Sequence, residues 1–186
     1  MMIPEEEILD LTLTKRGDYA VRAAISLAKV FPSGGYRKIR EVAAEMDLPL
    51  RYTPQILNLL LKAGIAEARA GQQGGYRLLR SPEEVSLLDV VEASEGPLRS
   101  ERCTLRGGPC HWENVCPLHF TWEEGRRALS RVLQSKSLAS IVAVDSSLEA
   151  GTIAVPGLPQ AYRCASLRRM TWRSLSRDGP VRSISR

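Results

Sequence analysis

Hydrophobic residues recur with helical spacing in three successive segments of the N-terminal half of the chain. The first segment predicts a helix from Thr14, as N-cap, to about Val30. A second, shorter helix is predicted over 39–46 and a third from 51–53 to Lys62, with a short turn between the two. Two helices joined by a short turn and preceded by another helix are typical of a helix-turn-helix domain.

Strand-like segments follow the third predicted helix. Residues 65–69 and 76–79 are short runs separated by a glycine-rich tip, which predicts a β-hairpin. Ser81 and Pro82 are expected to open a fourth helix, and one long helix is predicted over 121–144. The expected fold class is therefore mainly α with a small β-hairpin wing, a winged helix-turn-helix followed by a long helix.

These elements divide the chain into five parts. They are an acidic N-terminal extension (1–12), the winged helix-turn-helix domain (13–98), a loop with three cysteines (99–119), a helix with an apolar stripe (120–145) and a basic tail (146–186). The tail has scattered arginines and serines without sustained periodicity, so we expect it to be largely disordered.

Charge is segregated along the chain, which is more informative than the overall net charge of +5. Residues 157–186 alone carry a net charge of +6, so the remainder is close to neutral. Within that remainder, residues 15–80 hold twelve Lys/Arg against five Asp/Glu, whereas the flanks 1–14 and 81–98 hold acids and no Lys or Arg. A basic block between two acidic segments indicates a surface that faces phosphates.

Polar side chains on the expected outer face of the third helix are candidates for contacts with double-stranded DNA. They are groups of the kind that read base edges or phosphates in a major groove, namely Arg51, Tyr52, Thr53, Gln55 and Asn58. The hairpin adds candidates around glycines, where the backbone can approach a phosphate or a minor groove, namely Arg69, Gln72, Gln73 and Arg77. A solvated face explains each residue alone equally well, but the set favours DNA binding.

Five segments, in order along the chain, resemble the Rrf2 family of bacterial transcription regulators. They are LTKRGDYAVR (13–22), LLLKAGI (59–65), GGYRL (74–78), VSLLDVVE (85–92) and SLA (137–139). The resemblance covers roughly residues 11–145. It implies a DNA-binding repressor that forms a homodimer largely through the helix at 120–145 and binds an imperfect palindromic operator.

Cys103, Cys110 and Cys116 lie in one glycine-containing loop, with six and five residues between them. Three thiolates close in sequence can converge on one metal centre, and His119 follows three positions after Cys116. Taken alone, this spacing is close to that of a three-cysteine, one-histidine zinc site. Family members that sense iron–sulfur status or nitric oxide carry three cysteines in this loop. The resemblance therefore implies a 2Fe–2S or 4Fe–4S cluster, with zinc and a thiol redox switch as alternatives.

Two residues are candidates for the fourth ligand of such a cluster. The resemblance implies His119, used by relatives that sense cluster assembly, or Asp18, where nitric-oxide-sensing relatives place a carboxylate that reaches in from the partner subunit. We favour Asp18, because an oxygen ligand is labile and would connect the cluster to the DNA-binding domain. Cys164 stands alone in the tail and is interpreted as an incidental thiol.

Several other classes of protein are disfavoured by the sequence. The acidic N-terminus is unlike a secretory signal, and no apolar run is long enough to cross a bilayer, so a cytoplasmic protein without membrane contact is expected. The chain has no Cys-x-x-Cys pair, no nucleotide-binding glycine motif and no Ser/His/Asp constellation. An enzyme is therefore not expected.

Overall fold

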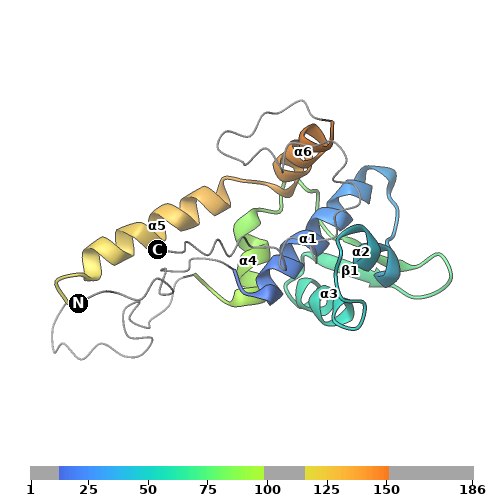
Figure 1. Cartoon of the computed structure of the whole chain (residues 1–186), viewed down its shortest axis with the longest axis horizontal. Coiled ribbons are helices and arrows are strands. Elements are labelled where there is room, and N and C mark those ends of the chain that lie inside the picture. Colours follow the sequence, from blue (N-terminus) through green and yellow to red (C-terminus); the bar gives the residue numbers. More distant parts are fainter. Residues whose placement is uncertain (1–12, 99–115, 151–186) are drawn as a thin grey trace, which may run out of the picture.

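Six helices and one β-hairpin make up the part of the chain that this computed structural model describes, residues 13–98 and 116–150 (Figure 1). The elements are α1 (Lys15–Val30), α2 (Ile39–Glu45), α3 (Thr53–Lys62), β1 (Ala66–Arg69), β2 (Gly75–Leu78), α4 (Leu87–Glu95), α5 (His119–Gln134) and α6 (Leu138–Glu149). A short 3-10 turn follows α1. The expectations for the extension 1–12, for most of the cysteine loop and for the tail beyond residue 150 lie outside the described residues.

The first three helices form the predicted helix-turn-helix. The Thr14 hydroxyl accepts hydrogen bonds from the backbone amides of Arg16 (3.2 Å) and Gly17 (3.4 Å), which satisfies two free amides at the start of α1. Between α2 and α3 the chain turns at Asp47, which has a left-handed conformation (φ 50°). Pro54 lies in the first turn of α3, where its missing amide costs no helical hydrogen bond.

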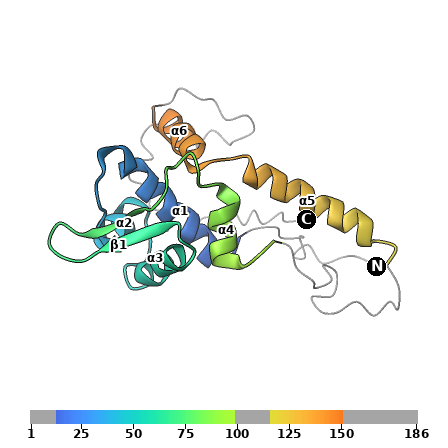
Figure 2. The ribbon, with the colours of Figure 1, turned by 180° about the vertical axis from the view of Figure 1, so that it is seen from behind.

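The predicted wing is a two-stranded antiparallel hairpin at the end of the molecule opposite α5 (Figures 1 and 2). The strands pair in a register that places Ala66 opposite Leu78 and Arg69 opposite Gly75. Arg37, two residues before the start of α2, extends the hairpin through two backbone hydrogen bonds with Tyr76, each 2.8 Å long. The fold class expected from the sequence is confirmed.

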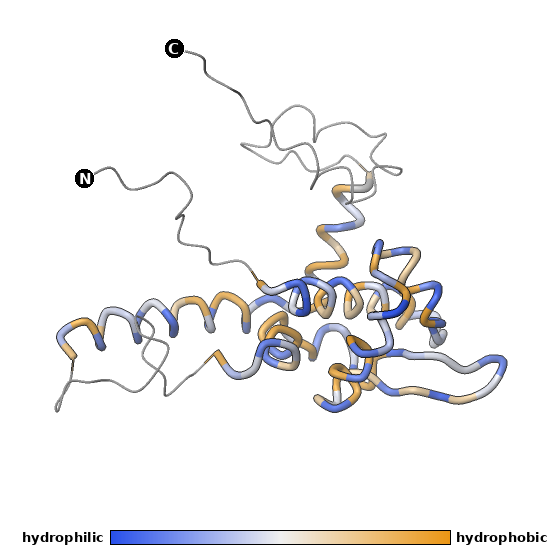
Figure 3. Tube along the Cα trace, turned by 60° about the horizontal axis from the view of Figure 1, so that its bottom comes forward, coloured by the Kyte–Doolittle hydropathy of each residue, from blue (hydrophilic) through white to orange (hydrophobic). Residues whose placement is uncertain are grey.

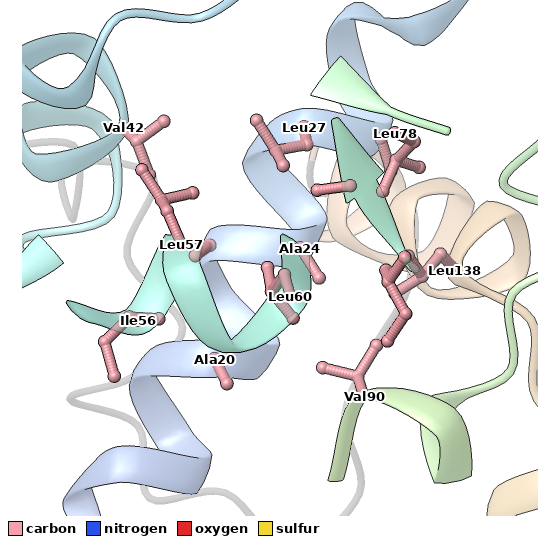
Figure 4. Packing of buried hydrophobic residues seen from close by; sticks show 14 of the residues in the cluster. Ala20, Ala24, Leu27, Val42, Ile56, Leu57, Leu60, Leu78, Val90 and Leu138 are labelled. Carbon is pink, nitrogen blue, oxygen red and sulfur yellow. The ribbon is translucent and has the colours of Figure 1, made fainter. Parts of the chain in front are cut away.

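We call residues 13–98 the head. One hydrophobic core stabilises it (Figure 4). α1 contributes mainly alanines, which lets the neighbouring helices approach closely. The larger side chains of the core come from α1, α2, α3, both sides of the hairpin, α4 and α6, and include Leu27, Val42, Ile56, Leu57, Leu60, Ile65, Leu78, Val90 and Leu138. Burial of this apolar surface is the main contribution to the stability of the head.

The fourth helix begins later than predicted, at Leu87 instead of at the Ser81-Pro82 dipeptide. The Ser86 hydroxyl accepts a hydrogen bond from the Asp89 amide (3.1 Å), and the Asp89 carboxylate accepts one from the Ser86 amide (2.9 Å). This reciprocal capping box defines the start of α4. The Ser81-Pro82 dipeptide opens only a turn.

The single long helix predicted over 121–144 is wrong, because the structure has two helices in this region, α5 and α6. Ser137 is the N-cap of α6, and its hydroxyl accepts a hydrogen bond from the Ser140 amide (3.2 Å). α6 also continues to Glu149, so the boundary placed at 145 is too early and the first residues assigned to a disordered tail are helical. The break was not predicted because the apolar stripe continues across it.

The break between α5 and α6 is caused by pairing with the segment before α4. The Leu87 amide donates to the Lys136 carbonyl (2.7 Å), and the Leu138 amide donates to the Val85 carbonyl (2.9 Å). These hydrogen bonds engage the Lys136 carbonyl and the Leu138 amide, which a continuous helix would pair within itself. We call the contact between residues 85–87 and 136–138 the seam.

α5 extends away from the head, whereas α6 packs against α1 (Figures 1 and 2). α5 has no buried residue, and hydrophobic positions recur along it (Figure 3). Large apolar side chains are exposed on α5 and directly before it, at Leu118, Phe120, Trp122, Leu129 and Val132. An ion pair of 2.5 Å between Lys29 and Asp145 joins α1 to α6. In the described part of the chain, no helix combines the length and the apolar character that a membrane span requires.

Replacement of Leu138 by Ala should lower the free energy of unfolding by about 2–5 kcal/mol, because it removes a completely buried side chain and leaves a cavity. Urea unfolding followed by circular dichroism would measure the change. Leu79→Ala is the matched control, since Leu79 is 53% exposed, and it should cost less than about 0.5 kcal/mol. Equally small losses in both variants would contradict the docking of α6 through this core.

Candidate nucleic-acid interface and cysteine loop

The outer surface of α3 presents three of the polar side chains that were predicted to contact DNA. Three apolar residues of α3 turn into the core (Figure 4), so the helical period places Gln55 and Asn58 on the opposite, exposed side. Arg51 is exposed in the turn that leads into α3. The amide and guanidinium groups of these residues can form paired hydrogen bonds with base edges or phosphates.

Two other residues of the predicted set are less accessible: Thr53 is buried and Tyr52 is half-buried. Thr53 is completely buried, and its hydroxyl donates to the Pro49 carbonyl (3.1 Å), so it is not placed to contact a duplex. Tyr52 is half-buried, and its ring packs edge-on against the Tyr19 ring, with the centroids 6.0 Å apart. Both side chains support the start of α3, and of the two only Tyr52 remains partly accessible.

The tip of the hairpin presents Arg69, Gln72 and Gln73, all of which are exposed. Gly71 has a φ of 105°, a conformation that other residues rarely adopt. A side chain at Gly74 would collide with the carbonyl of Arg69. The glycines therefore allow a tightly folded backbone with three long side chains at its surface, as a wing that approaches a groove requires.

Arg77, the fourth residue predicted on the hairpin, is bound within the protein. Its guanidinium donates to the Glu67 carboxylate on the paired strand and lies 4.8 Å from the centroid of the Tyr36 ring. The Tyr36 hydroxyl donates to the same carboxylate (3.0 Å). The hydrogen bond from Arg77, followed by the one from Tyr36, lowers the pKa of Glu67, so the carboxylate remains charged and offsets the charge of Arg77.

The twelve basic residues of the block 15–80 fall into two groups. Five are half-buried and have partners within the protein: Arg22 with Asp18, Lys29 with Asp145, Arg37 with Glu45, Arg77 with Glu67, and Lys38 with two backbone carbonyls. Seven are exposed, namely Lys15, Arg16, Arg40, Arg51, Lys62, Arg69 and Arg80. The exposed group is available to phosphates, whereas the half-buried group holds elements of the head together.

Only the end of the cysteine loop lies in the part of the chain that the structure describes, and Cys103 and Cys110 lie outside it. Cys116 is a free, half-buried thiol shortly before α5, and His119 is the exposed first residue of that helix. The His119 amide donates to the Cys116 carbonyl (2.9 Å), so the two residues lie within one turn. Residues 13–98 and 116–150 alone contain no cluster of three potential metal ligands.

Asp18, the other candidate ligand, lies in the first turn of α1, with 39% of its side chain exposed. Arg22 binds both carboxylate oxygens, and its Nε donates to Oδ1 at 3.1 Å. The same guanidinium donates to the Met46 carbonyl (2.9 Å) at the end of α2. A chain of polar contacts therefore runs from Asp18 to the turn between α2 and α3.

Sequence analysis missed Glu95, which connects the end of α4 to the start of α1. Its carboxylate accepts hydrogen bonds from the amide (3.1 Å) and the hydroxyl (2.6 Å) of Thr14. A side chain at Gly17 would collide with this carboxylate, so the glycine leaves room for it. Glu95 fixes the point at which the chain leaves the head toward the cysteines. Gly17 inside a regular helix was the only local signal of a close approach.

Residues 13–144 match the Rrf2 family, which is described as an iron-dependent transcriptional regulator. The match covers the head, the cysteine loop, α5 and most of α6. The chain therefore belongs to the Rrf2 family of transcriptional regulators. In this family, α3 and the hairpin belong to a DNA-binding winged-helix domain. The relatives of the chain are regulators of transcription, not enzymes.

Relatives with known names or structures agree with this assignment. An HTH-type transcriptional regulator of Mycobacterium tuberculosis is 30% identical over 70% of this chain and 81% of the relative, and the HTH-type transcriptional regulator IscR of Aliivibrio salmonicida is 27% identical over 75% and 81%. CymR, the global cysteine regulator of B. subtilis, has a TM-score of 0.62 at 25% identity over 73% of this chain and 98% of CymR. The IscR of T. potens has a TM-score of 0.59 at 26% identity, over 78% and 93%.

Gln55→Ala should relax the preference for particular base pairs by about 1–3 kcal/mol if Gln55 forms a bidentate contact with a base. Competition binding with operators mutated one base pair at a time would measure this preference. Gln134→Ala, an exposed glutamine at the end of α5, is the matched control and should leave the preference unchanged. An unaltered base preference in Gln55→Ala would remove this residue from the base-reading set.

Arg69→Ala should weaken binding to all DNA sequences alike and lower the slope of log affinity against log salt by about one, because an exposed cation is lost. Arg77→Ala should change the slope less, since Glu67 already offsets its charge. Fluorescence anisotropy at several salt concentrations would give both slopes. A larger change for Arg77→Ala than for Arg69→Ala would contradict the division of the basic block.

Proposed function

We propose that this protein is a homodimeric transcriptional repressor whose binding to an imperfect palindromic operator is controlled by an iron–sulfur cluster. The observation that carries the proposal is the position of the three-cysteine loop. It connects α4 to α5. The end of α4 is joined to the DNA-binding head by Glu95, and the far end of α5 is joined to the head by the seam. A change in the loop therefore acts on elements that pack against α1.

The donors of the loop suit an iron–sulfur cluster. Three thiolates from Cys103, Cys110 and Cys116 provide soft ligands, and Cys116 is a free thiol that is partly accessible in the described structure. A bound cluster would supply a centre that reacts with nitric oxide or oxygen, or whose presence reports the supply of clusters. The protein's own residues hold it and relate its presence to the head.

Asp18 is the fourth ligand that we favour, reaching the loop of the partner subunit. Its carboxylate is held by Arg22, which also donates to the Met46 carbonyl beside the turn of the helix-turn-helix. A carboxylate engaged elsewhere would remove the ion pair that holds Arg22, and the polar support of that turn would change. His119 is the competing candidate, since it lies one turn from Cys116 on the same chain.

The exposed apolar face of α5 supports a homodimer. Isolated soluble proteins rarely expose large apolar patches, and α5 exposes large apolar side chains near both of its ends (Figure 3). Helical spacing places Leu118, Trp122, Leu129 and Val132 on one side. A second copy of α5 would cover this face and place two heads on one duplex. Two identical heads related by two-fold symmetry read a palindrome.

A thiol redox switch is the second candidate function, and a specific similarity favours it. The chain resembles CymR, described as a cysteine regulator, and it also resembles an oxidized form of Staphylococcus aureus CymR, with a TM-score of 0.55 at 27% identity. In this alternative the cysteines would respond without a cluster. A structural zinc site formed by the same cysteines and His119 is the remaining alternative.

Protein purified without oxygen should be brown, with visible absorption that disappears in Cys103→Ala, Cys110→Ala and Cys116→Ala, since each variant removes a thiolate ligand. Cys164→Ala is the matched control and should keep the absorption. Iron and sulfide analysis alongside the spectra would identify the cluster. A colourless protein that contains zinc, or that contains no metal and forms disulfides on oxidation, would contradict the cluster and favour the corresponding alternative.

Asp18→Ala should yield a less stable cluster and reduce the effect of the cluster on DNA affinity, whereas His119→Ala should keep a nearly normal spectrum. The expected difference follows from the position of Asp18 at the start of α1 and its connection through Arg22 to the helix-turn-helix. Anaerobic spectra and operator titrations of both variants would measure it. A lost spectrum in His119→Ala with an unaffected Asp18→Ala would reverse the assignment, and indifference at both would indicate an exogenous fourth ligand.

A further inference from the structure

Lys38 occupies the position directly before α2, where helices usually carry Ser, Thr, Asp or Asn. A lysine side chain has only donors, so it cannot accept a hydrogen bond from the free amides of a helix start. The start of α2 is stabilised by a side chain within the helix, because the Glu41 carboxylate accepts a hydrogen bond from the Lys38 backbone amide (2.8 Å). The ammonium group of Lys38 therefore has no capping role in α2.

The Lys38 ammonium reaches the tip of the wing. It donates to the carbonyls of Gln72 (2.5 Å) and Gly71 (3.2 Å). The Gly71 carbonyl also accepts a hydrogen bond from the Gly74 amide (3.1 Å), which closes the turn at the tip. One cation thus connects the start of α2 to the turn that carries the exposed glutamines.

This contact differs from those of the other half-buried basic residues between positions 15 and 80, all of which the structure describes. Arg22, Lys29, Arg37 and Arg77 each pair with a carboxylate, and Arg22 also donates to the Met46 carbonyl, whereas the Lys38 ammonium donates to two backbone carbonyls at the wing tip. A contact with backbone restrains the conformation of the tip and leaves the side chains of Gln72 and Gln73 exposed. Such a restraint matters because glycine-rich segments sample many conformations when nothing holds them.

We propose that Lys38 is a positioning residue for DNA recognition, which holds the wing tip so that Gln72 and Gln73 meet the duplex in a preset arrangement. Binding then does not have to order the tip, and the affinity for DNA is higher for that reason. The inference rests on the proposed contact between the wing and DNA. It adds a residue that does not touch DNA to those that determine the affinity.

Lys38→Ser separates this role from a merely structural one, because serine supplies the missing helix cap while it removes the tether. The melting temperature should stay the same or rise, and hydrogen exchange of the amides at 71–75 should become faster. The operator affinity of the full-length protein should fall about fivefold or more, the equivalent of ordering one backbone residue on binding. Lys38→Arg, which keeps a cationic donor, should retain most of the affinity.

The salt dependence of binding distinguishes positioning from a direct contact with phosphate. For Lys38→Ser, the slope of log affinity against log salt should stay close to that of the unaltered protein. A slope lower by about one would show that Lys38 binds a phosphate and would overturn the proposal. A fall in both melting temperature and affinity would also overturn it, since the residue would then be needed only for folding.

A double variant, Gln72→Ala with Gln73→Ala, separates the failure of this inference from the failure of the wing contact on which it rests. If the double variant binds the operator less well but Lys38→Ser binds normally, the wing contacts DNA and Lys38 does not position it. If both bind like the unaltered protein, Gln72 and Gln73 do not contribute to binding, and both their proposed contact with DNA and the role of Lys38 fail. Loss of affinity in both, with a stable fold in Lys38→Ser, is the expected result.

Discussion

Two backbone hydrogen bonds in the seam, 2.7 and 2.9 Å long, hold the C-terminal helices on the DNA-binding head, and the buried side chain of Leu138 locks this contact into the core. α4 begins at one side of the seam, and α6 begins at the other. The cysteine loop leaves the end of α4 and returns at the start of α5. The segment from α4 through the loop to α5 is therefore joined to the head at both ends, and the proposed regulation requires that a rearrangement of the loop shifts these helices.

Polar contacts at the start of α1 give such a rearrangement a route to the DNA-reading surface. Glu95, at the end of α4, accepts two hydrogen bonds from Thr14. One turn further along, Asp18 holds Arg22, which binds the Met46 carbonyl beside the turn into α3. Regulation of this kind requires two conformations of this region that differ in free energy, and a ligand can shift the equilibrium between them only by its differential affinity for the two.

Local patterns were sufficient to predict most of the head, whereas contacts between distant segments were not predictable. Helical spacing and caps located α1 to α3, and a glycine-rich tip located the wing, because these signals lie within a few residues of the structures that they specify. The break between α5 and α6 was missed because its cause, the pairing with Val85 and Leu87, is far away in the sequence. At the candidate interface, periodicity placed Gln55 and Asn58 correctly on the exposed face, but it could not show that Thr53 is buried or that Lys38 holds the wing.

In the proposed mechanism, the state of the cysteine loop sets the affinity of the head for DNA. The most direct measurement is the operator affinity of one anaerobic preparation, determined before and after removal of its cluster at constant salt. Because allosteric coupling free energies are typically about 1–3 kcal/mol, the two affinities should differ by about fivefold or more. The difference should disappear in Cys116→Ala, which would bind DNA with the affinity of the cluster-free protein. Equal affinities before and after removal of the cluster would show that the cluster does not control DNA binding.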